Sequence, residues 1–148
     1  MCHARYIVYD ERTPAEEQFL YYARLAQSHL DAVIATDTNY NILSWNGAAE
    51  RLYGWKQEEV LGKCVNEIIP TIFFATTGSE ASERLQSKGY WKGEVRQKRK
   101  DGSSIPILAS VSVVKDGEGK IIGAVAANRD LTELTYTVSA IEMDDQLL

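Results

Sequence analysis

A chain of 148 residues is long enough for one domain with a buried core and short flanking segments. Apolar residues make up 45% of the chain and charged residues 25%, which is ordinary for a soluble globular protein. The formal net charge of −5, from 16 Lys and Arg against 21 Asp and Glu, argues against a nucleic-acid-binding role, because such a role usually needs a basic face.

Membrane and secreted classes are also disfavoured. No stretch approaches the roughly 20 apolar residues of a membrane span, and no signal-peptide core follows the first residues. The two cysteines, Cys2 and Cys64, have the spacing of neither a disulfide framework nor a zinc site. We therefore expect a cytoplasmic protein that makes no membrane contact through this chain.

The first predicted element is a helix over residues 14–30, which follows a tail at 1–13. Thr13 to Glu16 has a hydroxyl N-cap, a proline at the first helical position and a capping-box glutamate. Phe19, Tyr22 and Ala26 then form an apolar stripe at helical spacing. Such a stripe needs a partner, either the sheet of its own domain or a second copy of the chain. We expect a homodimer through these three residues.

The central part of the chain predicts a hairpin and several short helices. A β-branched run returns on itself around the turn Asp37 to Tyr40. Gly54, Gly62 and Gly89 are typical helix stops, and Thr77 begins a capping box. We expect strands at 32–36 and 41–45, and helices at 46–54, 56–61 and from 77 through 85 toward 89.

The C-terminal part changes from helical to alternating periodicity. Apolar residues recur at every second position from Ile105 to Val113, and Asp-Gly turns separate the runs. We expect strands at 94–100, 105–113 and 121–128. Two strands, then helices, then three strands predict an α+β domain, with one antiparallel sheet and helices on one side.

Short motifs stand in a fixed order between Thr36 and Glu133. They are Thr36-Asp37, Ile42 to Asn46, Gly54-Trp55, Gly62-Lys63, Gly89 to Glu94, Arg99 to Ser103, and Arg129 to Glu133. Together they resemble a PAS domain, the sensor module of signalling proteins, over residues 31–133. The resemblance implies a five-stranded antiparallel sheet with short helices on one face, cradling a cavity, and flanking N- and C-terminal helices. Residues 134–148 would then begin an output helix.

The sequence departs from the family pattern at two places. Tyr40 stands where the family usually has glycine, so we expect Asn39 to take a left-handed conformation in the first turn. Lys56 stands where the family favours serine or threonine, so the helix that follows loses its usual N-cap.

The motif Asp130-Leu131-Thr132 matches the Asp-x-Thr signature that ends a PAS core. Asp130 at an N-cap and Glu133 three residues on can satisfy each other's amides, which fixes where the exit helix starts. Arg129 beside them can pair with a neighbouring carboxylate. We expect Arg129, Asp130, Thr132 and Glu133 to transmit the signal, with an ordinary helix start as the alternative. Residues 6–13 echo the same pattern, so 1–13 could be the end of a preceding repeat.

The candidate ligand pocket combines apolar residues of the central segment with two others. Ile69, Ile72 and Phe73 would form one wall, Trp91 another, and Asn46 a polar anchor. The alternatives are that the apolar residues only fill the core and that Asn46 caps the next helix.

Particular cofactors can be weighed against the family's motifs. Covalent FMN looks excluded, because Gly62 to Asn66 carries its cysteine one position too early for the Gly-x-Asn-Cys-Arg motif. His-ligated haem is disfavoured, because no histidine lies between residues 65 and 90; His3 and His29 precede the domain. Non-covalent FAD stays open, since Trp91 lies where flavin-binding members often carry an aromatic residue. We expect no metal site.

No phosphate loop, nucleophile elbow or metal-ligand cluster is present, so we expect no catalytic residues. The sequence predicts a sensory and dimerisation module, such as the input domain of a histidine kinase in a two-component system. It would take a small-molecule ligand or respond to a partner. The alternatives are an FAD-binding redox sensor and a ligand-free structural adaptor.

Overall fold

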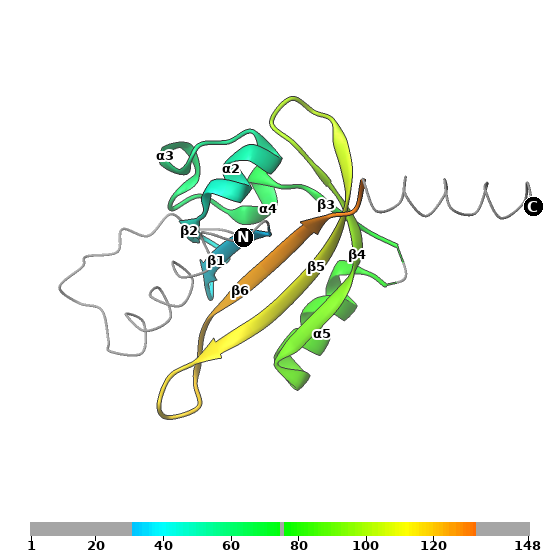
Figure 1. Cartoon of the computed structure of the whole chain (residues 1–148). Helices are drawn as coiled ribbons and strands as arrows, with labels where there is room; N and C mark the ends of the chain where they lie inside the picture. Colours follow the sequence, from blue (N-terminus) through cyan, green and yellow to red (C-terminus); the bar gives the residue numbers. More distant parts are fainter. Residues whose placement is uncertain (1–30, 75, 133–148) are drawn as a thin grey trace, which may run out of the picture.

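The computed structural model describes residues 31–74 and 76–132, which form one antiparallel sheet with short helices (Figure 1). The strands are β1 (Ala32–Asp37), β2 (Ile42–Trp45), β3 (Thr71–Phe73), β4 (Tyr90–Lys98), β5 (Ser104–Lys115) and β6 (Ile121–Asp130). The helices are α2 (Gly47–Tyr53), α3 (Gln57–Val60), α4 (Val65–Ile68) and α5 (Gly78–Lys88). The α+β fold class is thereby confirmed.

Several expectations lie outside the described residues. They are the tail or repeat remnant at 1–13, the helix at 14–30 with Phe19, Tyr22 and Ala26, the residue Glu133, and the output helix at 134–148.

The sheet places the first and last described strands side by side in its interior. Its order is β2-β1-β6-β5-β4-β3, so β6 pairs with both β1 and β5. The five expected strands are present, and a sixth, β3, lies on the outer edge beside β4. The prediction missed β3 because three residues after Pro70 are too few to show a strand period.

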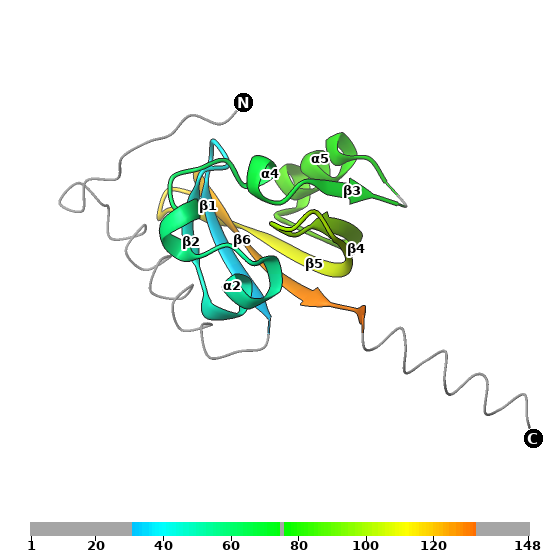
Figure 2. The same ribbon diagram turned by 90° about the horizontal axis from the view of Figure 1, so that it is seen from above.

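The helices cover one face of the sheet, as the view from above shows (Figure 2). Ile105, Ile107 and Ala109 of β5 are buried on this inner face, as their alternation predicts. They join a core that includes Trp45 and Tyr53. A smaller group surrounds buried Ala35 on the opposite face: Leu43, Val114, Ile122 and Val125.

The helix boundaries follow their predicted caps. Asn46 precedes α2, and its Oδ1 accepts from the Ala49 amide at 2.9 Å. Gly54 ends α2 with φ of 81°, a conformation that glycine adopts at little cost. Thr77 caps α5 by accepting from the Glu80 amide at 3.1 Å, and Gly89 ends it. The single-turn helix α4 was not predicted, because four residues show no helical repeat.

The first turn is built differently from the prediction. Tyr40 itself, and not Asn39, takes the left-handed conformation, with φ of 65°. The Asp37 carboxylate fixes this turn by accepting from the Asn39 and Asn41 amides at 2.8 and 3.0 Å. With Asn39 held in that hydrogen-bonded turn, the chain reverses one residue later.

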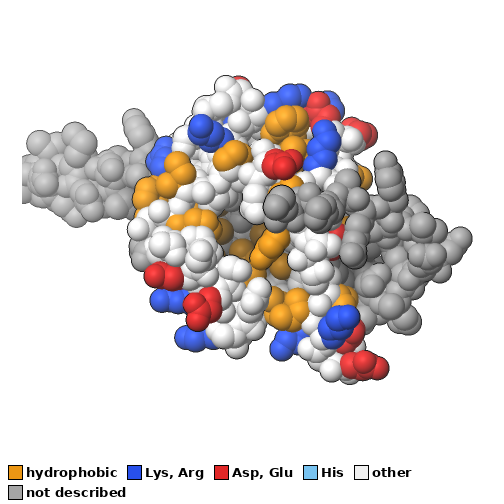
Figure 3. Space-filling model, turned by 180° about the vertical axis from the view of Figure 1, so that it is seen from behind, with side chains coloured by type: hydrophobic (Ala, Val, Ile, Leu, Met, Phe, Trp, Pro, Cys, Tyr) orange, Lys and Arg blue, Asp and Glu red, His pale blue; other side chains and the backbone are white. Residues whose placement is uncertain are grey.

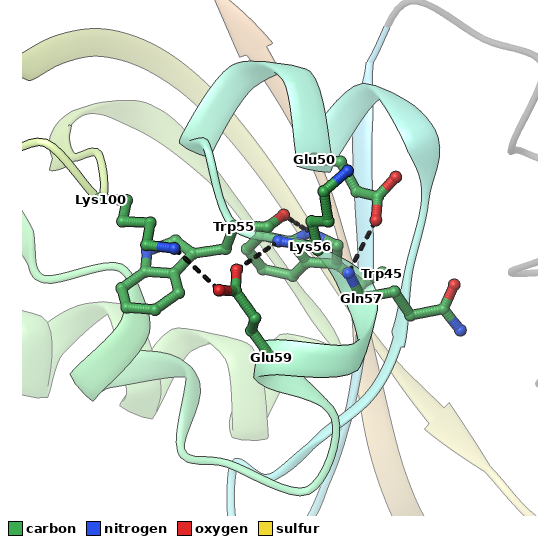
Figure 4. Close-up of polar contacts among 7 residues, drawn as sticks. All are labelled: Trp45, Glu50, Trp55, Lys56, Gln57, Glu59 and Lys100. Atoms are coloured by element: carbon green, nitrogen blue, oxygen red, sulfur yellow. Dashed lines mark hydrogen bonds and ion pairs between the residues drawn. The ribbon is translucent and has the colours of Figure 1, made fainter.

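The missing N-cap at Lys56 is replaced by carboxylates (Figure 4). Lys56 gives no side-chain cap, but Glu59 reaches back and accepts from the Lys56 amide at 2.9 Å. Glu50 of the preceding helix accepts from the Gln57 amide at 2.7 Å. Two orphan amides of α3 are thus satisfied by acidic side chains, which also suit the positive end of the helix.

Glu59 also joins the helices to the distant β4–β5 turn (Figure 4). The Lys100 Nζ lies 2.8 Å from Glu59 Oε1 and 4.9 Å from the centroid of the Trp55 ring. The Lys100 amide donates to the Tyr53 carbonyl at 2.9 Å. The hydrogen bond from Lys100 is the main reason why the pKa of Glu59 lies below its usual range.

We predict that Glu59→Gln destabilises the protein at neutral pH and that the difference from the parent shrinks in acid. A carboxyl whose pKa is lowered by folding stabilises the folded state above its unfolded pKa, about 4.3 for glutamate. That contribution is lost as the pH falls through the folded pKa. Urea unfolding between pH 3 and 7 measures the effect, and Glu58→Gln, on the same helix and exposed, is the control. A constant difference across that range would contradict the assignment.

Candidate functional site

A cavity of about 640 Å³ lies between the inner face of the sheet and the helices. Its residues come from β1, β3, β4, β5 and β6, from α4 and α5, and from the segments beside them. They are Ile34, Thr36, Tyr40, Val65, Asn66, Ile69, Pro70, Thr71, Phe73, Gly78, Ala81, Ser82, Leu85, Trp91, Val95, Gln97, Ala109, Val111, Ala124, Ala126 and Asn128. A cavity of this volume is typical of small-molecule sites.

The lining is uncharged. It contains no lysine, arginine, aspartate or glutamate. Figure 3 shows one face of the molecule, where hydrophobic side chains gather in a hollowed middle and charged side chains lie around it. An ion placed in such a lining would lose its hydration without gaining a counter-charge, so the cavity favours uncharged molecules.

Small side chains at the centre of the sheet leave the space open. Ala109 of β5 and Ala124 and Ala126 of β6 all face the cavity. The register brings Ala126 opposite Val111 on one side and opposite Ile34 on the other. A packed core would carry larger residues at these positions. The alanine methyl groups therefore leave unfilled space above the centre of the sheet, between the larger side chains around it.

One wall of the cavity is aromatic. The Phe73 and Trp91 rings meet edge to face, with centroids 5.5 Å apart and planes at 65°. The Trp91 ring lies over Gly93, where an added Cβ would come within 2.6 Å of Trp91 Cζ2. The Trp-x-Gly spacing of the sequence therefore has a packing reason: the glycine makes room for the ring.

A chain of hydrogen bonds crosses the polar end of the cavity. Asn128 Nδ2 donates to the Tyr53 hydroxyl at 3.0 Å, and that hydroxyl donates to Gln97 Oε1. Gln97 Nε2 donates to Thr71 Oγ1 at 3.3 Å, and Thr71 donates to the Ile69 carbonyl at 3.1 Å. Three strands and one helix are thereby linked through side chains.

The Tyr53 hydroxyl keeps its proton. The side chain is fully buried, and this burial raises the pKa of Tyr53 far above its usual range. The hydrogen bond from Asn128 opposes the shift, and the nearby Asp130 charge adds to it. A protonated hydroxyl can both accept from Asn128 and donate to Gln97.

Three of the five predicted pocket residues lie together in the lining: Ile69, Phe73 and Trp91. Ile72 does not line the cavity, because it points to the other side of β3 and is 56% exposed. Asn46 also lies outside the lining. Its Oδ1 accepts from the amides of Val33 and Ala49, and its Nδ2 donates to the Asp31 carbonyl. It therefore fastens α2 to the start of β1.

Sequence reasoning missed Gln97 and Asn128. Both are polar residues in strands whose other inward-facing residues are apolar or small. In β4, Gln97 follows Trp91, Gly93 and Val95; in β6, Asn128 follows Ala124 and Ala126. Each continues the pattern in which every second side chain of its strand faces inward, and a polar residue in that pattern was the sequence signal that could have identified it.

The predicted transmission residues lie at the end of β6, directly after the cavity residue Asn128. Arg129 Nε lies 3.1 Å from Asp31 Oδ1, which joins the end of β6 to the start of β1. Asp130 Oδ1 accepts from the Thr132 amide at 2.9 Å and from its hydroxyl at 2.6 Å. The Leu131 amide donates to the Pro106 carbonyl. Glu133, the expected capping-box partner, lies outside the described residues.

The lining offers no residue of the kind to which the family attaches FMN covalently or by which it ligates haem. It contains neither cysteine nor histidine, and both histidines of the sequence precede residue 31. Cys64 is buried beside the cavity residue Val65 but is not part of the lining. Within residues 31–74 and 76–132, no group of His, Cys, Asp and Glu side chains is arranged to hold a metal ion. No helix in the same ranges has the length and hydropathy needed to cross a bilayer.

An antiparallel sheet, short helices over one of its faces and an uncharged cavity between them form the architecture of a sensory module. The family model "PAS fold" matches residues 20–131. The chain belongs to the PAS family, and the expected membership is confirmed.

Two curated relatives are sensors. The chain is 33% identical over 117 residues to the sensor protein FixL of Bradyrhizobium diazoefficiens, covering 76% of this chain and 23% of FixL. It is 30% identical over 111 residues to the oxygen sensor protein DosP of Escherichia coli, covering 69% of this chain and 13% of DosP. The chain thus spans less than a quarter of the relatives that it matches.

Solved structures agree with the fold. A PAS domain from Colwellia psychrerythraea aligns with a TM-score of 0.66 at 28% identity, covering 78% of this chain and 98% of that chain. An RNA-binding light-oxygen-voltage receptor aligns with a TM-score of 0.63 at 22% identity, covering 93% of this chain and 40% of that chain. The second likeness concerns the fold alone.

We predict that Tyr53→Phe lowers the free energy of unfolding by about 1–3 kcal/mol, since it leaves Gln97 Oε1 and Asn128 Nδ2 buried without their shared partner. Urea unfolding at pH 7 measures the loss. Tyr90→Phe removes the same hydroxyl from a side chain that is 62% exposed and is the control. Equal stabilities of the Tyr53 and Tyr90 variants would show that the buried hydrogen bonds contribute nothing.

Proposed function

We propose that this chain is the sensory input module of a longer signalling protein, such as a cytoplasmic histidine kinase of a two-component system. The module binds a small molecule in its cavity and passes the change through the end of β6. The observation that carries the proposal is the cavity of about 640 Å³, bordered by the strand that leads out of the domain. The sensor relatives support an input role.

The route from cavity to exit is short. Ala124, Ala126 and Asn128 line the cavity, and Arg129, Asp130 and Thr132 follow at once in the sequence. A ligand that displaces β6 would act on the Arg129–Asp31 pair and on the Asp130–Thr132 cap together. Both contacts are exposed and weak enough to rearrange, because exposed ion pairs contribute about 0–1 kcal/mol. Glu133 would complete the transmitting group.

We predict that native mass spectrometry of the freshly purified chain detects a bound small molecule and that Ala126→Leu reduces its occupancy several-fold. Leucine at residue 126 would fill the floor of the cavity. Ala127→Leu, the neighbouring position on the opposite face of β6, should keep the parent's occupancy. A parent that carries no ligand, and binds none from a cell extract, would refute the proposal.

An FAD-binding redox sensor is the alternative within the same cavity, with Trp91 in the aromatic wall. Visible absorption of the same preparation separates the two, because bound flavin is coloured and a colourless ligand does not absorb visible light. A ligand-free structural adaptor, the other alternative, would leave the cavity empty in every preparation.

We further propose a homodimer through the apolar stripe of the N-terminal segment. Charges on that stripe should break such a dimer, so Phe19→Glu with Ala26→Glu is expected to halve the mass of the particle in multi-angle light scattering. Glu16→Gln with Glu17→Gln, next to the stripe, should keep the parent's mass. An unchanged mass in the Phe19 and Ala26 variant would assign the stripe to its own sheet.

A further inference from the structure

The buried amide of Asn128, beside the cavity, has one hydrogen-bonding atom without a partner. Asn128 is 3% exposed and lines the cavity. Its Nδ2 is engaged by the Tyr53 hydroxyl, whereas its Oδ1 has no hydrogen-bond partner. Among the buried unpartnered side-chain atoms of the described chain, it is the one whose residue belongs to the lining. A buried carbonyl oxygen without a partner lowers the stability of the folded state, so a group that donates a hydrogen bond to it is favoured there.

The orientation of this amide follows from the far end of the hydrogen-bond chain. The chain ends at the Ile69 carbonyl, which can only accept, so the Thr71 hydroxyl must donate to it. Thr71 then accepts from Gln97 Nε2, which leaves Gln97 Oε1 to accept from Tyr53. Tyr53 in turn accepts from Asn128 Nδ2. The direction of each hydrogen bond is fixed by the previous one, and Asn128 Oδ1 is left without a donor.

Reversing the chain would cost a hydrogen bond. If Asn128 turned its Nδ2 away from Tyr53, then Tyr53 would donate to Oδ1, Gln97 Nε2 to Tyr53, and Thr71 to Gln97. The Ile69 carbonyl would lose its donor. One net hydrogen bond corresponds to roughly two- to tenfold in population, so the forward direction is preferred.

We propose that the cavity selects an uncharged, mainly apolar and aromatic molecule that donates one N–H or O–H to Asn128 Oδ1. The absence of charged residues in the lining disfavours ions, and the Phe73–Trp91 wall favours a flat ring. This inference rests on the proposed function, because it requires the cavity to bind a ligand. Beyond that function, it specifies the chemical class of the ligand and the protein atom that would bind its donor group.

Matched probes test the donor requirement on the full 148-residue chain. The pairs are indole with 1-methylindole, and 2-naphthol with 2-methoxynaphthalene, in which a methyl group replaces only the donor hydrogen. Isothermal titration calorimetry should show the N–H and O–H members binding at least fivefold more tightly. Indole-3-carboxylate, which adds a charge, should bind more weakly than indole.

Three variants assign the preference to the proposed atom. Asn128→Leu removes the acceptor and should abolish the difference within each pair. Asn66→Leu removes an amide from an exposed residue of the same lining and should retain it. Thr71→Val removes the hydroxyl that sets the direction of the chain, so Asn128 presents Oδ1 in only about half of the molecules and the difference should fall by up to about twofold. This last variant leaves Asn128 in place and keeps the test valid should Asn128→Leu fail to fold.

The outcomes separate the two proposals. Equal affinities within each pair, as a water bridging Asn128 Oδ1 would produce, overturn the donor requirement while the ligand-binding cavity stands. A preference that stays undiminished in both Thr71→Val and Asn128→Leu also overturns it. Failure of every uncharged probe to bind, together with a ligand-free native preparation, refutes the cavity as a binding site and the inference with it.

Discussion

The Tyr53 hydroxyl is the constraint on which the arrangement of the domain depends. It is fully buried at the end of α2, so both its donor and its acceptor capacity must be met within the protein. The partners come from β4 and β6, which are separated by β5 in the sheet. The Tyr53 hydroxyl therefore joins α2 to two strands that are not neighbours in the sheet. It fixes the depth at which the helix layer sits over the sheet.

That fixed depth, combined with small residues on the sheet, produces the cavity. Elsewhere on the inner face the space under the helices is filled by large side chains such as Trp45 and Ile107. Between α5 and the centre of the sheet, small alanine side chains at residues 109, 124 and 126 line the cavity. The Tyr53 contacts join the helix layer to the sheet at one end of this volume, and the Phe73–Trp91 pair of the neighbouring strands β3 and β4 forms a wall at the other.

The same topology connects this volume to the ends of the domain. Because β6 pairs with β1, the last strand lies beside the first, and Arg129 meets Asp31 although the two are 98 residues apart. A strand that lines the cavity thus ends where both flanking segments join. The start of β1 and the end of β6 therefore lie side by side in the described structure.

The sequence by itself determined the local structure. Helix stops at Gly54 and Gly89, the caps at Asn46 and Thr77, and the alternation from Ile105 onward depend on neighbouring residues, and the motif order indicated the family. Only the tertiary structure decided the left-handed Tyr40, the edge strand β3, the exposure of Ile72 and the joining of Gln97 and Asn128 through Tyr53. Those depend on strand register and on contacts between residues as many as 75 positions apart, which no local pattern encodes.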